Sequence, residues 1–217
     1  MGSIDMPEQH RLRAAIITSR RSPGTGGIQA WSQGLASEAS EAGYRVTTWG
    51  LRDRDFLAAN RGLMAMLRAE RLVFASWKYF LALRSLLKVR QRLGDTPQIL
   101  LLVHGLELAD LQPEVLRKLN RAVEEFKVKL MANSAFTHRR AQAIGLEGDW
   151  ERSRPSANLP ELAAREDSSL GRQIVTVTRL VERKNLFRAI DAVAALNREG
   201  AALDYWIIGG GHLYNAL

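Results

Sequence analysis

Short apolar runs alternate along this chain with longer stretches in which apolar residues recur every three or four positions. The runs predict buried strands, and they lie at 13–19 (RAAIITS), 44–49, 99–103 (ILLLV) and 127–132. The periodic stretches predict helices that pack on those strands, and they lie at 28–42, 113–125 and 135–144. Alternating strands and helices are the building units of a parallel sheet. The pattern therefore predicts an α/β fold with a Rossmann-like, doubly wound parallel sheet.

The stretch from about 56 to 93 is predicted to be helical and carries most of the positive charge. Residues 52–92 hold ten Lys and Arg against three Asp and Glu, in a chain whose net charge is +8. On a helical wheel, the part from 76 to 93 gathers cations and a tryptophan on one arc, with most apolar residues opposite. This arc favours reversible docking on an anionic membrane, and a solvated face is the alternative. The predicted contact residues are Trp77, Lys78, Arg84, Lys88 and Arg92.

A break in the pattern separates two predicted domains. From 147 to 172 the sequence is charged and contains Pro and Ser, as is typical of a linker. A further unit of buried strand, helix and second strand follows from Ile174 and ends at a run of glycines. We therefore expect a first domain over 1–160 and the first part of a second domain over 161–217.

Composition narrows the functional classes. The 217 residues are 46% apolar, enough to bury a core, and no apolar run reaches the roughly 18 residues that span a bilayer. With no secretory signal and no cysteine, the sequence favours a cytoplasmic protein and excludes disulfides and cysteine nucleophiles. The positive net charge leaves nucleic-acid binding as an alternative function. No recognition motif supports it, so we predict no nucleic acid partner.

Glycines fill the loop after the first predicted strand, at 23–27 (PGTGG). Backbone N–H groups there, together with the N-terminal end of the next helix, can face an anion. The spacing matches neither the dinucleotide-binding fingerprint nor a Walker loop. An ordinary tight turn is the alternative interpretation.

Three side chains follow strands at positions where open α/β sheets bind ligands. His104 comes after the third predicted strand, and it can donate to a sugar hydroxyl or a developing charge, or be bonded within the fold. Arg179 and Lys184 bracket a turn in the second domain, where a guanidinium and an ammonium suit a diphosphate; solvated surface charges are the alternative. The triplet 53–55 (DRD) contains two carboxylates that could hold a divalent metal on a sugar diphosphate. It lies in a basic run that is better explained as helix or loop surface, so we predict no metal site.

These segments, in this order, resemble the family-four glycosyltransferases, which are retaining enzymes of the GT-B architecture with two Rossmann-like domains. The resemblance runs through most of the chain. The segments that carry it are 26–29 (GGIQ), 103–105 (VHG), 132–137 (ANSAFT), 178–184 (TRLVERK) and 208–213 (IGGGHL).

The resemblance implies a role for each candidate residue. Gly26 and Gly27 would approach the donor phosphate or the acceptor, and His104 would face the transferred sugar. Arg179 and Lys184 would hold the diphosphate and stabilise the leaving nucleotide, a step that needs charge stabilisation more than a protein nucleophile. A glycine turn would lie at the nucleotide base, formed by Gly209, Gly210 and Gly211.

The resemblance also implies a substrate class and a setting. The donor would be a UDP- or GDP-sugar, without a metal cofactor, and the acceptor a saccharide or a lipid-linked saccharide. The setting would be bacterial polysaccharide or glycolipid biosynthesis, with a peripheral position on the inner face of the plasma membrane.

Two departures from the family pattern shape the expectation. The family continues well beyond the glycine turn and includes a Glu-x7-Glu pair that this sequence lacks, and 154–159 (RPSANL) is a poor copy of its Pro-Asn-Gly segment. We therefore expect a retaining hexosyltransferase family member truncated within its donor-binding domain, with little or no transfer activity. The alternative is a non-catalytic acceptor- or membrane-binding subunit of a split glycosyltransferase.

Overall fold

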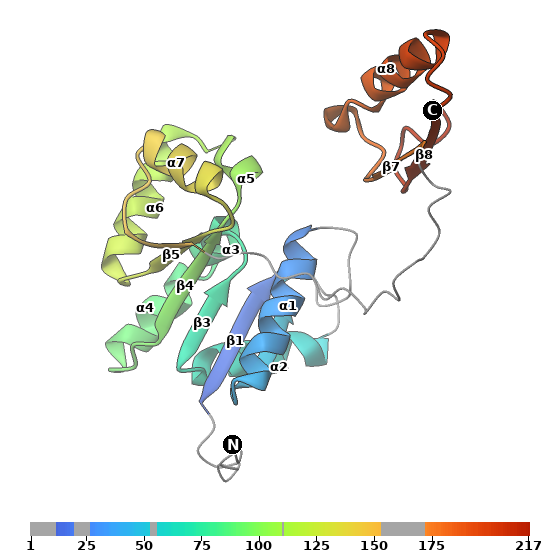
Figure 1. The fold of residues 1–217 in the computed structure, drawn as a ribbon. Helices are drawn as coiled ribbons and strands as arrows, with labels where there is room; N and C mark the ends of the chain where they lie inside the picture. The colour runs from blue at the N-terminus through green and yellow to red at the C-terminus, as the bar shows by residue number, and fades with distance from the viewer. Residues whose placement is uncertain (1–11, 20–26, 53–55, 110, 153–171) are drawn as a thin grey trace, which may run out of the picture. The chain divides into compact units, whose positions relative to one another are not determined.

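The computed structural model describes residues 12–19, 27–52, 56–109, 111–152 and 172–217 (Figure 1). The chain divides into two compact units, Met1–Leu159 (unit 1) and Pro160–Leu217 (unit 2). Three features of the sequence lie outside the described residues: Gly26 with the loop before it, the triplet 53–55, and most of the predicted linker.

Six parallel strands form the sheet of unit 1, in the order β2-β1-β3-β4-β5-β6. They are β1 (Arg13–Thr18), β2 (Arg45–Gly50), β3 (Arg71–Phe74), β4 (Gln98–Val103), β5 (Lys129–Ala132) and β6 (Asp149–Arg152). The winding direction reverses between β1 and β3, which lie side by side in Figure 1. Such a switch point is where doubly wound sheets bind ligands. The predicted α/β class and parallel sheet are confirmed, and the sheet is consistent with a Rossmann-like fold.

Helices cover the two faces of this sheet because successive strand residues point to opposite sides. They are α1 (Gly27–Glu41), α2 (Phe56–Arg68), α3 (Trp77–Ala82), α4 (Arg84–Arg92), α5 (Gly105–Ala109), α6 (Pro113–Glu125) and α7 (Ala135–Ala143). On one face Trp31 of α1 packs with Ile16 of β1 and Leu102 of β4. On the other face Ala15 and Ile17 belong to a larger core, which α2, α3 and α6 supply with Met66, Phe80 and Leu119.

Two strands were not predicted. β3 lies inside the stretch predicted to be helical, because a four-residue apolar run between helices cannot be told from a helix by periodicity. As a result His104 follows the fourth strand of the chain and not the third. β6 lies inside the predicted linker, and three of its four residues are charged, as suits a strand that pairs with β5 alone at the edge of the sheet.

The helix predicted from 76 to 93 is interrupted. α3 and α4 are separate helices that meet at Leu83, whose backbone angles are φ −98° and ψ 8°. Ser76 caps α3, since its Oγ accepts a hydrogen bond of 3.2 Å from the backbone N of Lys78. Phe80 and Leu87 are buried, whereas Val89, which the wheel placed on the apolar side, is exposed.

A buried arginine joins α4 to the end of α2. The side chain of Arg90 is only 4% exposed, and its guanidinium donates to the carbonyl oxygens of Met66 and Ala69. Its Nε donates over 3.0 Å to the carboxylate of Asp95. Arg90 thus satisfies carbonyl groups that the end of a helix leaves without an internal partner.

Unit 2 is a strand, helix, strand unit, as predicted. β7 (Gln173–Val177) pairs in parallel with β8 (Asp204–Ile208), and α8 (Leu186–Arg198) lies between them in the sequence, preceded by the 3-10 turn Glu182–Lys184. The prediction that β7 is buried is wrong. Its side chains alternate between half-buried and exposed, with Val177 76% exposed, because apolar cover reaches only one face among the described residues of this unit.

Candidate functional site

His104 lies at the carboxyl end of β4, next to the switch point of unit 1. It is 8% exposed, and its Nε2 is 3.1 Å from the carbonyl oxygen of Ala75, just after β3. The ring meets Trp31 of α1 edge to face, with 5.2 Å between the ring centroids. His104 therefore contacts the segments that follow β1 and β3, the two strands at the switch point.

The surroundings of His104 determine its protonation state and which ring nitrogen is left to bond to a ligand. Burial lowers the pKa of the imidazole and outweighs the Ala75 hydrogen bond, which acts in the opposite direction. A neutral imidazole carries one N–H, and the carbonyl of Ala75 requires that hydrogen on Nε2. Nδ1 is then left as an acceptor. The role predicted for a neutral ring changes accordingly: it can accept a hydrogen bond from a hydroxyl rather than donate one.

The first residue of α1 has open space around it. Gly27 is the first residue of α1, and a Cβ built on it would meet no protein atom within 4 Å. The described fold therefore does not require glycine there. Thr18, at the carboxyl end of β1, is 1% exposed, and its buried hydroxyl has no hydrogen-bond partner among the described residues. A buried hydroxyl left unpaired is costly, and such groups often mark functional positions.

Glu107 is a candidate residue that the sequence reasoning missed. Ser76 donates a 2.6 Å hydrogen bond to its Oε1, while its buried Oε2 has no partner in the part of the chain that the structure describes. Burial raises the pKa of the carboxyl group, against smaller opposite effects of Ser76 and Lys78. The sequence signal was the spacing in His-Gly-Leu-Glu, because residues three positions apart lie on the same side of a helical turn. In the structure the backbone N of Glu107 donates to the carbonyl of His104.

The turn after β5 is bonded within the fold. Ser134 caps α7 by accepting from the backbone N of Thr137 over 3.1 Å. The hydroxyl of Thr137 donates to Asn133 over 2.7 Å, and a Cβ on Gly105 would lie 3.3 Å from that hydroxyl. The segment 132–137 and Gly105, which carry part of the family resemblance, are therefore explained by a structural role: they hold α5 close to α7.

In unit 2 the loops after β7 and β8 are bonded to each other. Leu180 donates from its backbone N to the carbonyl of Gly210 over 3.0 Å, and Leu213 donates to the carbonyl of Leu180 over 3.2 Å. A Cβ on Gly209 would lie 1.8 Å from the carbonyl oxygen of Thr178, and one on Gly211 would lie 2.2 Å from that of Leu180. These two glycines are therefore required by the close contact that brings the turn to the loop containing Arg179.

Arg179 and Lys184 are both exposed, and no ion pair is found for either among the described residues. Beside them, Nε2 of His212 lies 2.7 Å from Oε1 of Glu182. The pKa of Glu182 is lowered, chiefly by a hydrogen bond from its own backbone and then by His212. This pair, which the sequence reasoning missed, links the glycine turn to the 3-10 turn that ends at Lys184. Two cations and a glycine turn therefore share the carboxyl ends of β7 and β8.

The residues predicted to contact a membrane do not form one free cationic arc. Arg84 and Lys88 both pair with Glu125 of α6, with 3.2 Å between Nζ of Lys88 and the carboxylate. Trp77 packs on the core of unit 1, with Lys78 5.4 Å from the centre of its ring, and Arg92 is exposed. There are two physical reasons. The break at Leu83 separates α3 from α4, and the packing of α6 brings Glu125 to Arg84 and Lys88.

Within the described ranges, no cluster of three or more histidine, aspartate and glutamate side chains could hold a metal ion, and no helix is long and apolar enough to cross a membrane. No protein-family model matches the chain, and no curated protein matches it significantly. The family resemblance therefore stays a hypothesis that rests on the motifs of the sequence.

Proposed function

We propose that this chain belongs to a retaining glycosyltransferase of the GT-B architecture, which moves a sugar from a UDP- or GDP-sugar to a saccharide or lipid-linked acceptor. The observation that supports it most is the bonding of the two loops of unit 2, which brings Gly209–Gly211 to the loop that contains Arg179. Parallel strands in α/β folds bind ligands at this end.

The chemistry proposed for unit 2 is stabilisation of a leaving nucleoside diphosphate. The guanidinium of Arg179 can bind two phosphate oxygens at once, and the ammonium of Lys184 adds a mobile point charge. The backbone of the glycine turn has no side chains to keep a base at a distance. Charge stabilisation of this kind lowers the barrier to departure of the diphosphate without a metal ion.

The chemistry proposed for unit 1 is recognition of the sugar. A neutral His104 presents Nδ1 as an acceptor for a sugar hydroxyl, and Glu107 offers a partly buried carboxyl one helical turn away. The open space at Gly27 leaves room for a phosphate or hydroxyl near the first N–H groups of α1.

Calorimetric titration of the whole chain with UDP and with GDP tests the donor site. We expect one nucleotide to bind, and Arg179→Gln with Lys184→Gln to weaken binding at least about tenfold, since hydrogen bonds to charged groups are worth roughly 1.5–3 kcal/mol each. The matched control is Arg198→Gln, which makes the same change at the other end of α8 and should leave binding unchanged. Equal binding by the double variant, or no binding of either nucleotide, contradicts the proposal.

A second substitution tests unit 1. Gly27→Ala meets no steric obstacle and improves helix propensity, so the melting temperature without ligand should not fall. We expect the same variant to lose part of the stabilisation that a UDP- or GDP-sugar gives to the unaltered chain. Unchanged stabilisation would show that the glycine serves no ligand.

A further inference from the structure

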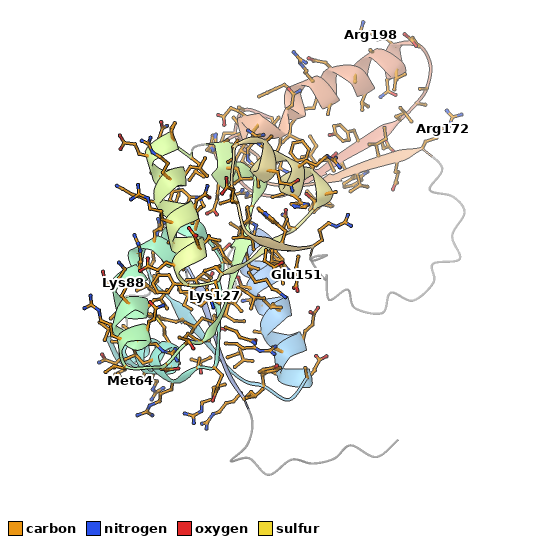
Figure 2. All side chains as sticks on the ribbon, turned by 90° about the vertical axis from the view of Figure 1, so that its left-hand side faces the viewer. Met64, Lys88, Lys127, Glu151, Arg172 and Arg198 are labelled. Carbon is orange, nitrogen blue, oxygen red and sulfur yellow. The ribbon has the colours of Figure 1, made fainter. Side chains whose placement is uncertain are left out.

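A groove lined by arginines lies at the opposite end of the unit 1 sheet from His104. It has a volume of about 480 Å³ and is formed between α2 and the first residues of β1 and β2. Its cationic lining residues are Arg13, Arg45, Arg61 and Arg68. Met64, labelled in Figure 2, marks this groove at the end of unit 1 where the strands begin. Because β1 spans six residues, the groove is roughly 17 Å along the sheet from the candidate sugar site.

The four arginines converge for reasons of register and helix period. Arg13 and Arg45 are directly paired in the sheet, and their positions share a face with Ile17 and Trp49, which belong to the core that Met66 of α2 completes. On α2 the positions of Arg61 and Arg68 are seven residues apart and so return to the same side of the helix. The small side chain of Ala65 lies between them and contributes to the hollow.

The charge of this groove is not balanced by the described structure. All four arginines are exposed, and no ion pair is found for any of them among the described residues. The nearest carboxylate in the hydrogen-bond pattern is Glu70, which accepts from the backbone N of Arg13 over 2.6 Å. Arg13 and Arg45 are directly paired on neighbouring strands, so their like charges repel without a carboxylate partner among the described residues.

Two other hollows on unit 1 provide a contrast. One is lined by Asp95, Glu125 and Lys127, and the other combines Arg121 and Lys127 with three carboxylates. Both therefore mix charges of opposite sign. The arginine groove holds only cations among its charged lining residues, and guanidinium groups bind phosphate oxygens in pairs.

We propose that this groove is a second anion site, which binds a multiply charged phosphate group, carried either by a free small molecule or by a lipid headgroup. The site is independent of the proposed donor site, which lies in unit 2. It also differs from the predicted membrane contact on α3 and α4, where Glu125 already pairs with two of the cations.

Binding is tested with inorganic pyrophosphate and with phosphatidic acid vesicles, whose phosphomonoester headgroup can carry two charges, using phosphatidylcholine vesicles as the neutral reference. The parent protein carries Arg179→Gln and Lys184→Gln, so that the cations of unit 2 cannot account for binding. We expect binding at low salt that falls as salt rises, and Arg61→Gln with Arg68→Gln to weaken it at least about tenfold. Both positions are exposed on a helix and Gln is a good helix former, so the fold should persist.

The matched control is Arg117→Gln with Arg121→Gln, which removes two exposed arginines from α6. Pyrophosphate binding that only the α2 pair weakens supports a free phosphate ligand. Vesicle binding that only the α2 pair weakens supports a lipid headgroup. Equal loss in both pairs, or binding of neither probe by the parent protein, overturns the proposal.

Discussion

The two units of this protein bury their sheets to different extents. In unit 1, none of the large apolar side chains that are strongly exposed comes from a described strand. In unit 2, four strand residues expose 52–76% of their surface. These four alternate along the strands and so share one face of the two-stranded sheet: Val175, Val177, Trp206 and Ile208.

This difference shows what holds each unit together. Parallel strands are normally covered by helices on both faces, and unit 1 achieves this with α1 on one face and α2, α3 and α6 on the other. Unit 2 has a two-stranded sheet, which is marginal on its own, and depends on Leu180, Leu186 and the hydrogen bonds between its two loops. The candidate diphosphate site is therefore built on the less strongly packed of the two units.

Hydrogen exchange should show the largest contrast. We expect backbone amides of β3 and β4 to exchange only through global unfolding of unit 1, and those of β7 and β8 to exchange orders of magnitude faster. The measurement is amide-resolved exchange on the intact chain. Comparable protection of β7 and β4 would show that the open face of unit 2 is covered in solution.

Substitutions of aromatic residues should separate the units by stability. Phe74→Ala removes a side chain with no exposed surface and is expected to cost unit 1 about 3–5 kcal/mol of unfolding free energy. Trp206→Ala removes one that is 57% exposed and should cost unit 2 well under half as much. Urea unfolding followed at residues of each unit checks both values. A large loss on Trp206→Ala would contradict the exposure of that face.

Polar substitutions should reveal the open face directly. Val177→Thr with Trp206→Thr keeps residues that favour strands while removing apolar surface, so binding of a hydrophobic dye and self-association should both fall. The control is Val89→Thr, which alters an exposed apolar residue on α4 of unit 1. An equal effect of the control would mean that the face of unit 2 is not distinctive.

The pH dependence of stability should differ between the units by a smaller amount. The pKa of His104 is lowered from 6.5 by burial, so the unfolded chain binds more protons, and unit 1 loses stability as pH falls below about 6.5. Glu182 has its pKa lowered from 4.5, so its contribution to unit 2 is lost only at more acidic pH. The raised pKa of Glu107 acts in the opposite direction, so the His104 contribution is isolated by comparing variants: between pH 7 and 5, the urea midpoint of unit 1 should fall more in the unaltered chain than in His104→Gln. An unchanged slope in that variant would remove His104 as the cause.

The sequence predicted the parts of the fold whose signals are local. The stretches predicted to be helical at 113–125 and 135–144 form the helices Pro113–Glu125 and Ala135–Ala143, because helical periodicity depends on neighbours in the chain. β3 was missed, since a four-residue strand buried on both faces has no period of its own. The pairing of Arg84 and Lys88 with Glu125 was missed, because only the packing of α6 brings that carboxylate to them.

The candidate site also combines features that the sequence determined with features that only tertiary structure decided. The sequence by itself determined the α/β class and which residues follow the strands, among them His104, Arg179 and the glycines at 209–211, because strand ends are visible as pattern boundaries. Tertiary structure decided what those residues face. It placed Ala75 against Nε2 of His104, Ser76 against Glu107, and four arginines around one groove. Contacts of this kind join residues far apart in sequence, and only the register and order of the strands set their distances.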